Sequence, residues 1–176
     1  MAEKKTKIVL DNDVVNHFFK GGLLHMLPQI FPEFQYIILD VVKREIPIAI
    51  LSSLIPMMSK EKCIKEEVFG ASSGEKKEYL RLIATAAGLG LGKGESACMV
   101  YCRYHHDVIG SNNTKDIRSY CEQYGITYLT TNDFLFYAIR RGLLTKDEAA
   151  AFIQKIRSMG SYPEVVDFDT YICTKI

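Results

Sequence analysis

The stretch Lys7-Ile-Val-Leu-Asp-Asn-Asp-Val-Val15 decides the predicted fold. Its first four residues form a short apolar, β-rich run, and such a run bounded by polar residues is typical of a strand buried on both faces of a sheet. Residues 14–19 are predicted to form a helix, because Asp13 can cap its first turn and Gly21-Gly22 can end it. The chain therefore begins with a central strand followed by a helix.

The same alternation of strand and helix continues along the chain, and it predicts an α/β fold with right-handed crossovers and a parallel sheet. The segment 48–69 fits neither pattern clearly. The tail 162–176 alternates apolar and polar residues, so it is expected either to add a strand or to cover a neighbour's surface. Further strands are expected at 34–39, 108–109 and 126–130, and further helices at 23–30, 41–46, 75–87, 95–104, 114–123, 133–140 and 146–156.

Length and composition favour one globular domain over residues 1–176, with a C-terminal helix and tail at 145–176. Hydrophobic residues make up 48% of the 176 residues and charged residues 24%, which is ordinary globular usage. The 22 basic and 21 acidic residues give a formal net charge of +1, so any contact with nucleic acid must be local.

Cysteine usage predicts a cytoplasmic protein. The five cysteines are odd in number, contain no C-x-x-C pair, and follow no apolar signal segment. Cys98 and Cys102 are spaced for one helix face, where core packing is favoured over a zinc site. The apolar run 46–58 is too short for a bilayer-spanning helix, so no membrane span is expected.

Polar residues that end the predicted strands are the candidates for chemistry, because loops converge at the carboxyl edge of an open parallel sheet. Asp11 and Asp13 follow the first strand, where a hard cation such as Mg²⁺ would offset their mutual repulsion. The alternative for Asp13 is a helix cap, and a cap is also the favoured interpretation of Asp133. The other strand-end residues are Asp40, Asn112, Asn113 and Asn132.

Four segments resemble the PIN-domain family, which includes the VapC toxins of bacterial toxin and antitoxin pairs. They cover about residues 7–140 in the family's order, and the G-x-G-E segment followed by small residues is the most specific of them. The segments are Ile8-Val-Leu-Asp-Asn-Asp-Val-Val15, Asp40-Val-Val-Lys-Arg-Glu-Ile46, Gly92-Lys-Gly-Glu-Ser-Ala-Cys-Met-Val-Tyr-Cys102 and Ser111-Asn-Asn-Thr-Lys-Asp-Ile117.

This resemblance implies a PIN-like three-layer α/β/α fold with a central parallel sheet of about four or five strands. It also implies an endoribonuclease that depends on Mg²⁺ or Mn²⁺. The bound ion would lower the pKa of a water and stabilise charge on the scissile phosphate of RNA. It also implies an antitoxin protein and a second copy of the chain as partners. The implied catalytic residues are Asp11, Glu45, Glu95 and Asp116, the metal ligands are Asp11, Glu95, Asp116 and Asn113, and the RNA-backbone contacts are Lys93, Lys115 and Arg118.

Three alternatives stay open. Many PIN domains carry Asp where this chain has Asn113, so a degenerate PIN fold that binds RNA or protein without cutting is one of them. The opening segment also resembles phosphatases of the haloacid dehalogenase type, in which Asp11 would be the nucleophile and Asp13 the general acid. The glycine run at 88–94 suggests nucleotide binding only weakly, because it matches neither common phosphate-binding pattern.

Overall fold

The strand β1 (Lys7–Leu10) lies at the centre of a five-stranded sheet. Its side chains Ile8, Val9 and Leu10 are completely buried, which requires cover on both faces. The strand pairs in parallel with β2 (Gln35–Leu39) on one side and with β4 (Val108–Gly110) on the other. β3 (Ile64–Glu67) and β5 (Tyr128–Leu129) complete the order β3-β2-β1-β4-β5, again in parallel. The predicted parallel α/β sheet of four or five strands is therefore confirmed.

The computed structural model describes residues 5–86 and 91–176, so the helix end predicted at residue 87 and part of the glycine run at 88–94 lie outside the described residues. Among those described, no helix is both long and apolar enough to cross a membrane. The helices are α1 (Asn12–Gly21), η1 (Leu24–Met26), α2 (Leu27–Ile30), α3 (Asp40–Lys43), α4 (Ile48–Ser59), α5 (Ser73–Ala86), α6 (Lys93–His105), α7 (Thr114–Tyr124), α8 (Thr131–Arg140) and α9 (Lys146–Ser158).

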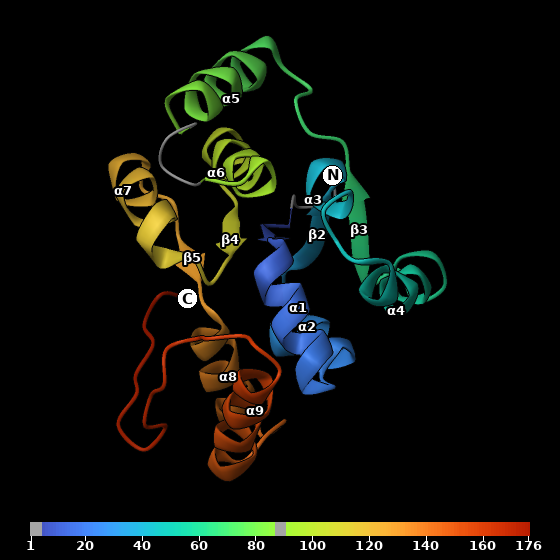
Figure 1. Cartoon of the computed structure of the whole chain (residues 1–176), viewed down its shortest axis with the longest axis vertical. Helices are drawn as coiled ribbons and strands as arrows, with labels where there is room; N and C mark the ends of the chain where they lie inside the picture. Colours follow the sequence, from blue (N-terminus) through green and yellow to red (C-terminus); the bar gives the residue numbers. More distant parts are fainter. Residues whose placement is uncertain (1–4, 87–90) are drawn as a thin grey trace.

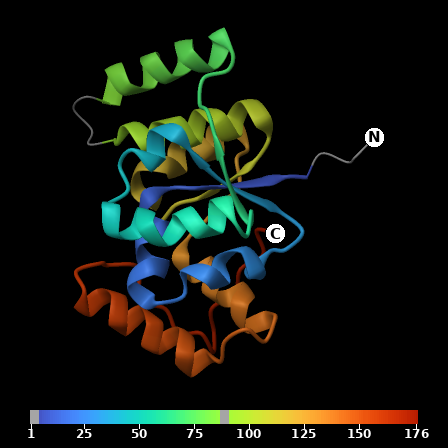
Figure 2. The same ribbon diagram turned by 90° about the vertical axis from the view of Figure 1, so that its right-hand side faces the viewer.

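Two helical layers enclose the sheet, which makes the three-layer α/β/α arrangement (Figures 1 and 2). The helices α5, α6 and α7 cover one face, and α1, α2, α4, α8 and α9 lie on the other. In Figure 2 the strands run from the N-terminal side on the right towards the left, so their carboxyl ends share one edge of the molecule. The loops that carry the strand-end polar residues meet at that edge.

The segment that the sequence pattern left unassigned, 48–69, contains a helix and an edge strand. The helix α4 buries Ile50, Leu54 and Met57, whereas Ile48 is 77% exposed. In β3 only Ile64 is fully buried, and the following Lys-Glu-Glu is mostly exposed. A strand with so little apolar alternation cannot be recognised by periodicity, since its pairing with β2 supplies the stability that its side chains do not.

The C-terminal tail folds back on the chain itself, and the added strand suggested by its alternation is wrong. Residues 162–176 contain no strand. Phe168 and Cys173 are buried in the core, and Lys175 makes an ion pair with Asp133 of α8 at 2.8 Å. Tyr171 Oη donates a hydrogen bond to the same carboxylate at 2.7 Å. The tail therefore covers its own helix α8.

Candidate active site at the carboxyl edge of the sheet

An open cavity of about 240 Å³ lies at the carboxyl edge of the sheet. Its walls come from the β1–α1 junction, the end of α3, the start of α6 and the loop after β4. Residues far apart in the sequence therefore meet because parallel strands end at the same edge. The residues that line it are Asp11, Asn12, Asp13, Glu45, Gly92, Glu95 and Asn113.

Asp11 lies at the floor of this cavity and is only 6% exposed. It caps α1, which begins two residues earlier than predicted, and its Oδ1 accepts a hydrogen bond from the Asn12 backbone N–H at 2.8 Å. Its Oδ2 accepts from Ser111 Oγ at 3.2 Å. Burial raises the pKa of Asp11 well above its ordinary value, and the neighbouring charge of Asp13 raises it further. The carboxylate is thus fixed in place but poorly solvated.

Asp13 joins the first strand end to the loop after β4. Its Oδ2 accepts a hydrogen bond from the Asn112 backbone N–H at 2.7 Å, and its Oδ1 accepts from the Val14 N–H at 2.6 Å. Burial raises its pKa to about 6 in spite of these bonds. Asp11, not Asp13, is the helix cap, so the cap interpretation of Asp13 is wrong.

Glu95, in the first turn of α6, approaches the same cavity from the opposite layer. It is 6% exposed, and its Oε1 has no hydrogen-bond partner among the described residues. Burial raises its pKa to about 7, and the charges of Asp13 and Asp116 contribute to the rise. A buried carboxylate oxygen without a donor is costly, and a cation in the cavity would relieve that cost.

Glu45 lies on the rim of the cavity and contacts Gly94 at the start of α6. The exposed Glu45 side chain accepts a hydrogen bond through Oε1 from the Gly94 backbone N–H at 3.0 Å. A Cβ atom at Gly94 would lie 2.5 Å from Glu45 Oε2 and 3.3 Å from a methyl group of Val42. The second glycine of the G-x-G-E segment therefore lets the start of α6 approach Glu45 closely.

Asp116 and Asn113 take different positions from those expected. Asn113 lines the cavity, and its Nδ2 donates a hydrogen bond to Asp116 Oδ2 at 2.7 Å. Asp116 itself does not line the cavity, although its charge acts on Glu95. The family resemblance implies that Asp116 is a catalytic residue and a metal ligand. In the structure, Asp13 lines the cavity, whereas Asp116 lies behind Asn113.

The donor set suits a hard cation that keeps part of its water shell. Over residues 5–86 and 91–176, no group of three or more His, Cys, Asp or Glu side chains is placed to hold a metal ion by itself. Mg²⁺ is usually bound through one or two carboxylates plus waters and does not need a full protein cage. Asp11, Asp13 and Glu95 line one cavity, so one or two of these carboxylates together with waters would meet that requirement.

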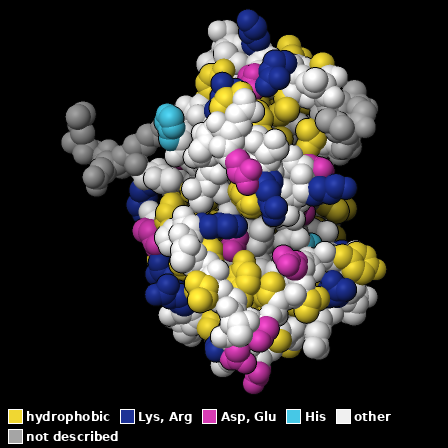
Figure 3. Space-filling model, turned by 90° about the vertical axis from the view of Figure 1, so that its left-hand side faces the viewer, with side chains coloured by type: hydrophobic (Ala, Val, Ile, Leu, Met, Phe, Trp, Pro, Cys, Tyr) yellow, Lys and Arg dark blue, Asp and Glu magenta, His cyan; other side chains and the backbone are white. Residues whose placement is uncertain are grey.

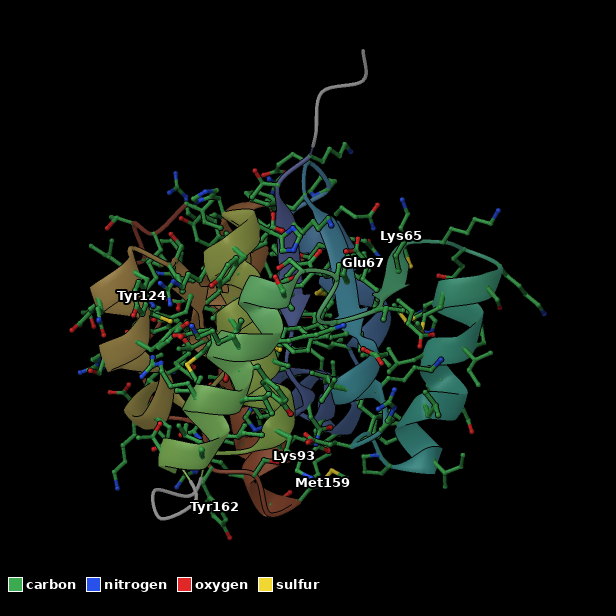
Figure 4. The ribbon with its side chains drawn as sticks, turned by 90° about the horizontal axis from the view of Figure 1, so that it is seen from above. Lys65, Glu67, Lys93, Tyr124, Met159 and Tyr162 are labelled. Carbon is green, nitrogen blue, oxygen red and sulfur yellow. The ribbon has the colours of Figure 1, made fainter. Side chains whose placement is uncertain are left out.

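Three basic residues that are close in sequence to the cavity lining are candidates for contact with phosphate. Lys93, Lys115 and Arg118 are exposed, and within the described part of the chain none of them forms an ion pair. In Figure 4, Lys93 and Tyr162 both lie in the lower part of the view. By contrast, Lys43 and Arg44 are paired with carboxylates at 2.5 and 2.6 Å.

Sequence reasoning missed Ser111 and the backbone of Asn112 as supports of the site. Both follow β4, so their position at a strand end was visible, but the hydrogen bonds across to α1 depend on tertiary packing.

The predicted cap role of Asp133 is confirmed, because Asp133 and Thr130 form a reciprocal cap at the start of α8. Cys98 and Cys102 are buried in the core, as expected.

Comparison with known proteins gives no argument about activity. No family model matches the chain, and no curated protein matches it either. One solved structure with a similar fold is a PilT N-terminus (PIN) domain protein from the hyperthermophilic archaeon Sulfolobus solfataricus P2. It has 11% sequence identity and a TM-score of 0.44, over 73% of this chain and 90% of that chain. This likeness is too distant to transfer an activity to the chain.

Proposed function

We propose that this chain is a metal-dependent ribonuclease that hydrolyses phosphodiester bonds in RNA. One observation carries the proposal: Asp11, Asp13 and Glu95 share one water-accessible cavity, their pKa values are raised by burial, and Glu95 Oε1 lacks a partner. Carboxylates held in this way repel one another and also repel a phosphate. A cation between them removes both repulsions, so the arrangement favours phosphate chemistry with a metal ion.

The residues of the site would have different roles. Asp11, Asp13 and Glu95 would hold Mg²⁺ or Mn²⁺, which when bound supplies a Lewis acid and a water of lowered pKa. Asn113 and Asp116 position Glu95 from the side of α7. Lys93, Lys115 and Arg118 would bind the RNA backbone, because phosphate contacts by basic side chains set the position of a strand. Glu45 is held on the rim by the Gly94 N–H.

The test is cleavage of a fluorescently labelled single-stranded RNA by the full chain with Mn²⁺ or Mg²⁺ and with EDTA. Cleavage should require the metal, and Asp11→Asn and Glu95→Gln should each reduce the rate at least about a hundredfold, as expected when charge stabilisation at the reacting phosphate is lost. Glu122→Gln is the matched control, because Glu122 is an exposed carboxylate near the far end of α7. Cleavage that persists in EDTA would contradict the proposal.

A non-cutting RNA-binding protein is the second candidate, and one observation favours it. Asn113 stands where a carboxylate is common in the PIN family, and its amide occupies Asp116 Oδ2 instead of leaving that oxygen free. This candidate predicts RNA binding that persists with Mn²⁺ while no product forms, and that is unaffected by Glu95→Gln. Replacing Asn113 by Asp should then create cleavage.

A further inference from the structure

A second polar cavity, of about 300 Å³, lies beside the candidate active site. The loop after β4 separates the two: Asn113 lines the first cavity, whereas its chain neighbours Asn112 and Thr114 line the second. The other walls come from the start of α8 and from the tail. The complete lining is Asn112, Thr114, Thr130, Asn132, Tyr162 and Glu164.

Asn132 lines this cavity and carries a buried acceptor without a hydrogen-bond partner among the described residues. Its side chain is 3% exposed, and its Nδ2 donates a hydrogen bond to the Glu164 carbonyl at 2.9 Å. That bond fixes the orientation of the amide. The other end, Oδ1, is buried and has no hydrogen-bond partner in the part of the chain that the structure describes. A ligand with an N–H group can supply the missing donor.

Tyr162 supplies an exposed aromatic ring to the lining of the same cavity. Its side chain is 75% exposed, yet the segment that carries it is held in place. Arg157 Nη1 donates a hydrogen bond to the Pro163 carbonyl at 3.0 Å, and Arg157 Cζ lies 5.6 Å from the centre of the Tyr162 ring. A ring that is held by its neighbours but open to solvent is the usual platform on which a base stacks in single-strand recognition.

The geometry points to a nucleobase subsite: this cavity takes one unpaired base of a single-stranded RNA, stacked on Tyr162 and donating an N–H to Asn132 Oδ1. The inference rests on the proposed function, because a base next to the bond to be cut is what the neighbouring cavity requires. Figure 3 shows basic and acidic side chains interspersed over the face of α7 and the tail, so attraction by charge alone does not explain recognition there.

This subsite would select single strands through hydrogen-bonding chemistry. The N–H donors on the Watson–Crick edge of a base are engaged in a duplex and are free only in an unpaired base. The Thr114 hydroxyl, in the same cavity, can donate to a ring nitrogen or a carbonyl of the base. The volume lies at the low end for small-ligand sites, which suits a single base.

The experiment is a titration of the full chain with nucleosides, followed by NMR of the Asn132 side-chain amide, without metal. Adenosine and uridine should shift this signal. N6,N6-dimethyladenosine and 3-methyluridine keep the ring faces but lack those N–H donors, and they should shift it several-fold less. Tyr162→Ala should weaken adenosine binding by a factor between about 5 and about 150, the range measured for base stacking on aromatic residues. Tyr162→Phe, the matched control, should retain binding.

The outcomes separate this inference from the proposed function. Selective binding of the N–H nucleosides that depends on the Tyr162 ring supports the subsite, whether or not the chain cuts RNA. Equal binding of the methylated nucleosides, no binding at all, or binding that Tyr162→Ala leaves unchanged overturns the subsite, even if RNA cleavage is observed.

Discussion

The substitution Glu95→Gln is expected to stabilise the metal-free protein at pH 8 and to change its stability little at pH 5. In the folded chain the pKa of Glu95 is raised from 4.5 to about 7, mainly by burial. One pKa unit corresponds to about 1.36 kcal/mol, so the ionised side chain destabilises the fold by about 3 kcal/mol above pH 7. Water in the open cavity reduces this cost, and we expect a measured difference of about 2 kcal/mol.

The sign follows from proton binding. Between pH 4.5 and about 7 the folded state keeps a proton on Glu95 that the unfolded state has released. The contribution of this group to stability is therefore greatest below pH 4.5 and is lost as the pH rises through 7. Glutamine is neutral at every pH, so the variant does not lose stability in this window. Wild type and variant should converge at acidic pH and separate at alkaline pH.

The assay is urea denaturation at pH 5 and pH 8 in EDTA, with the free energy of unfolding extrapolated to water. Glu45→Gln is the control, because Glu45 is an exposed carboxylate on the rim of the same cavity. It should show no pH-dependent gain. A loss of stability in Glu95→Gln at pH 8, or an equal change of stability at both pH values, would contradict the destabilising charge assigned to Glu95.

Three further perturbations are expected to change stability or cleavage. Burial lowers the pKa of His17 to about 4 from 6.5, so the wild type should lose about 2 kcal/mol relative to His17→Gln as the pH falls from 7 to 5, measured by urea denaturation. Gly94→Ala should displace Glu45 and lower the cleavage rate while thermal unfolding changes little, because the new Cβ would lie 2.5 Å from Glu45 Oε2. Lys175→Ala should lower stability by about 1 to 2 kcal/mol in the same denaturation assay, since Asp133 is 1% exposed and loses its ion pair.

The sequence predicted the fold well where side chains alone decide the structure. The apolar run of β1, which Asp11 ends, can be buried on both faces only in the interior of a sheet. Gly22 ends α1 in the left-handed conformation, which glycine adopts easily. The failures lie where pairing decides. β3 is an edge strand with a single buried apolar residue, and the tail alternates apolar and polar residues without forming a strand. In both cases the partner surface, not the local pattern, sets the conformation.

The same division holds for the candidate site. Asp11 and Glu95 could be predicted from strand-end position and the G-x-G-E segment, and both line the cavity. The position of Asp116 outside the cavity lining could not be predicted, because it depends on the tertiary fold of the loop after β4, where Asn113 binds the Asp116 carboxylate.

The loop after β4 forms part of the wall of both cavities, so a ligand in one cavity can act on the other. The backbone N–H of Asn112 donates to Asp13 in the first cavity, and Asn112 Oδ1 accepts from the Thr131 backbone N–H beside the second. A base seated against Asn132 would therefore press on the same loop that fixes Asp13. Binding at the subsite should tighten the candidate metal site, and by reciprocity a metal ion should raise the affinity for a nucleoside. If Mn²⁺ leaves adenosine affinity unchanged, the two cavities act independently.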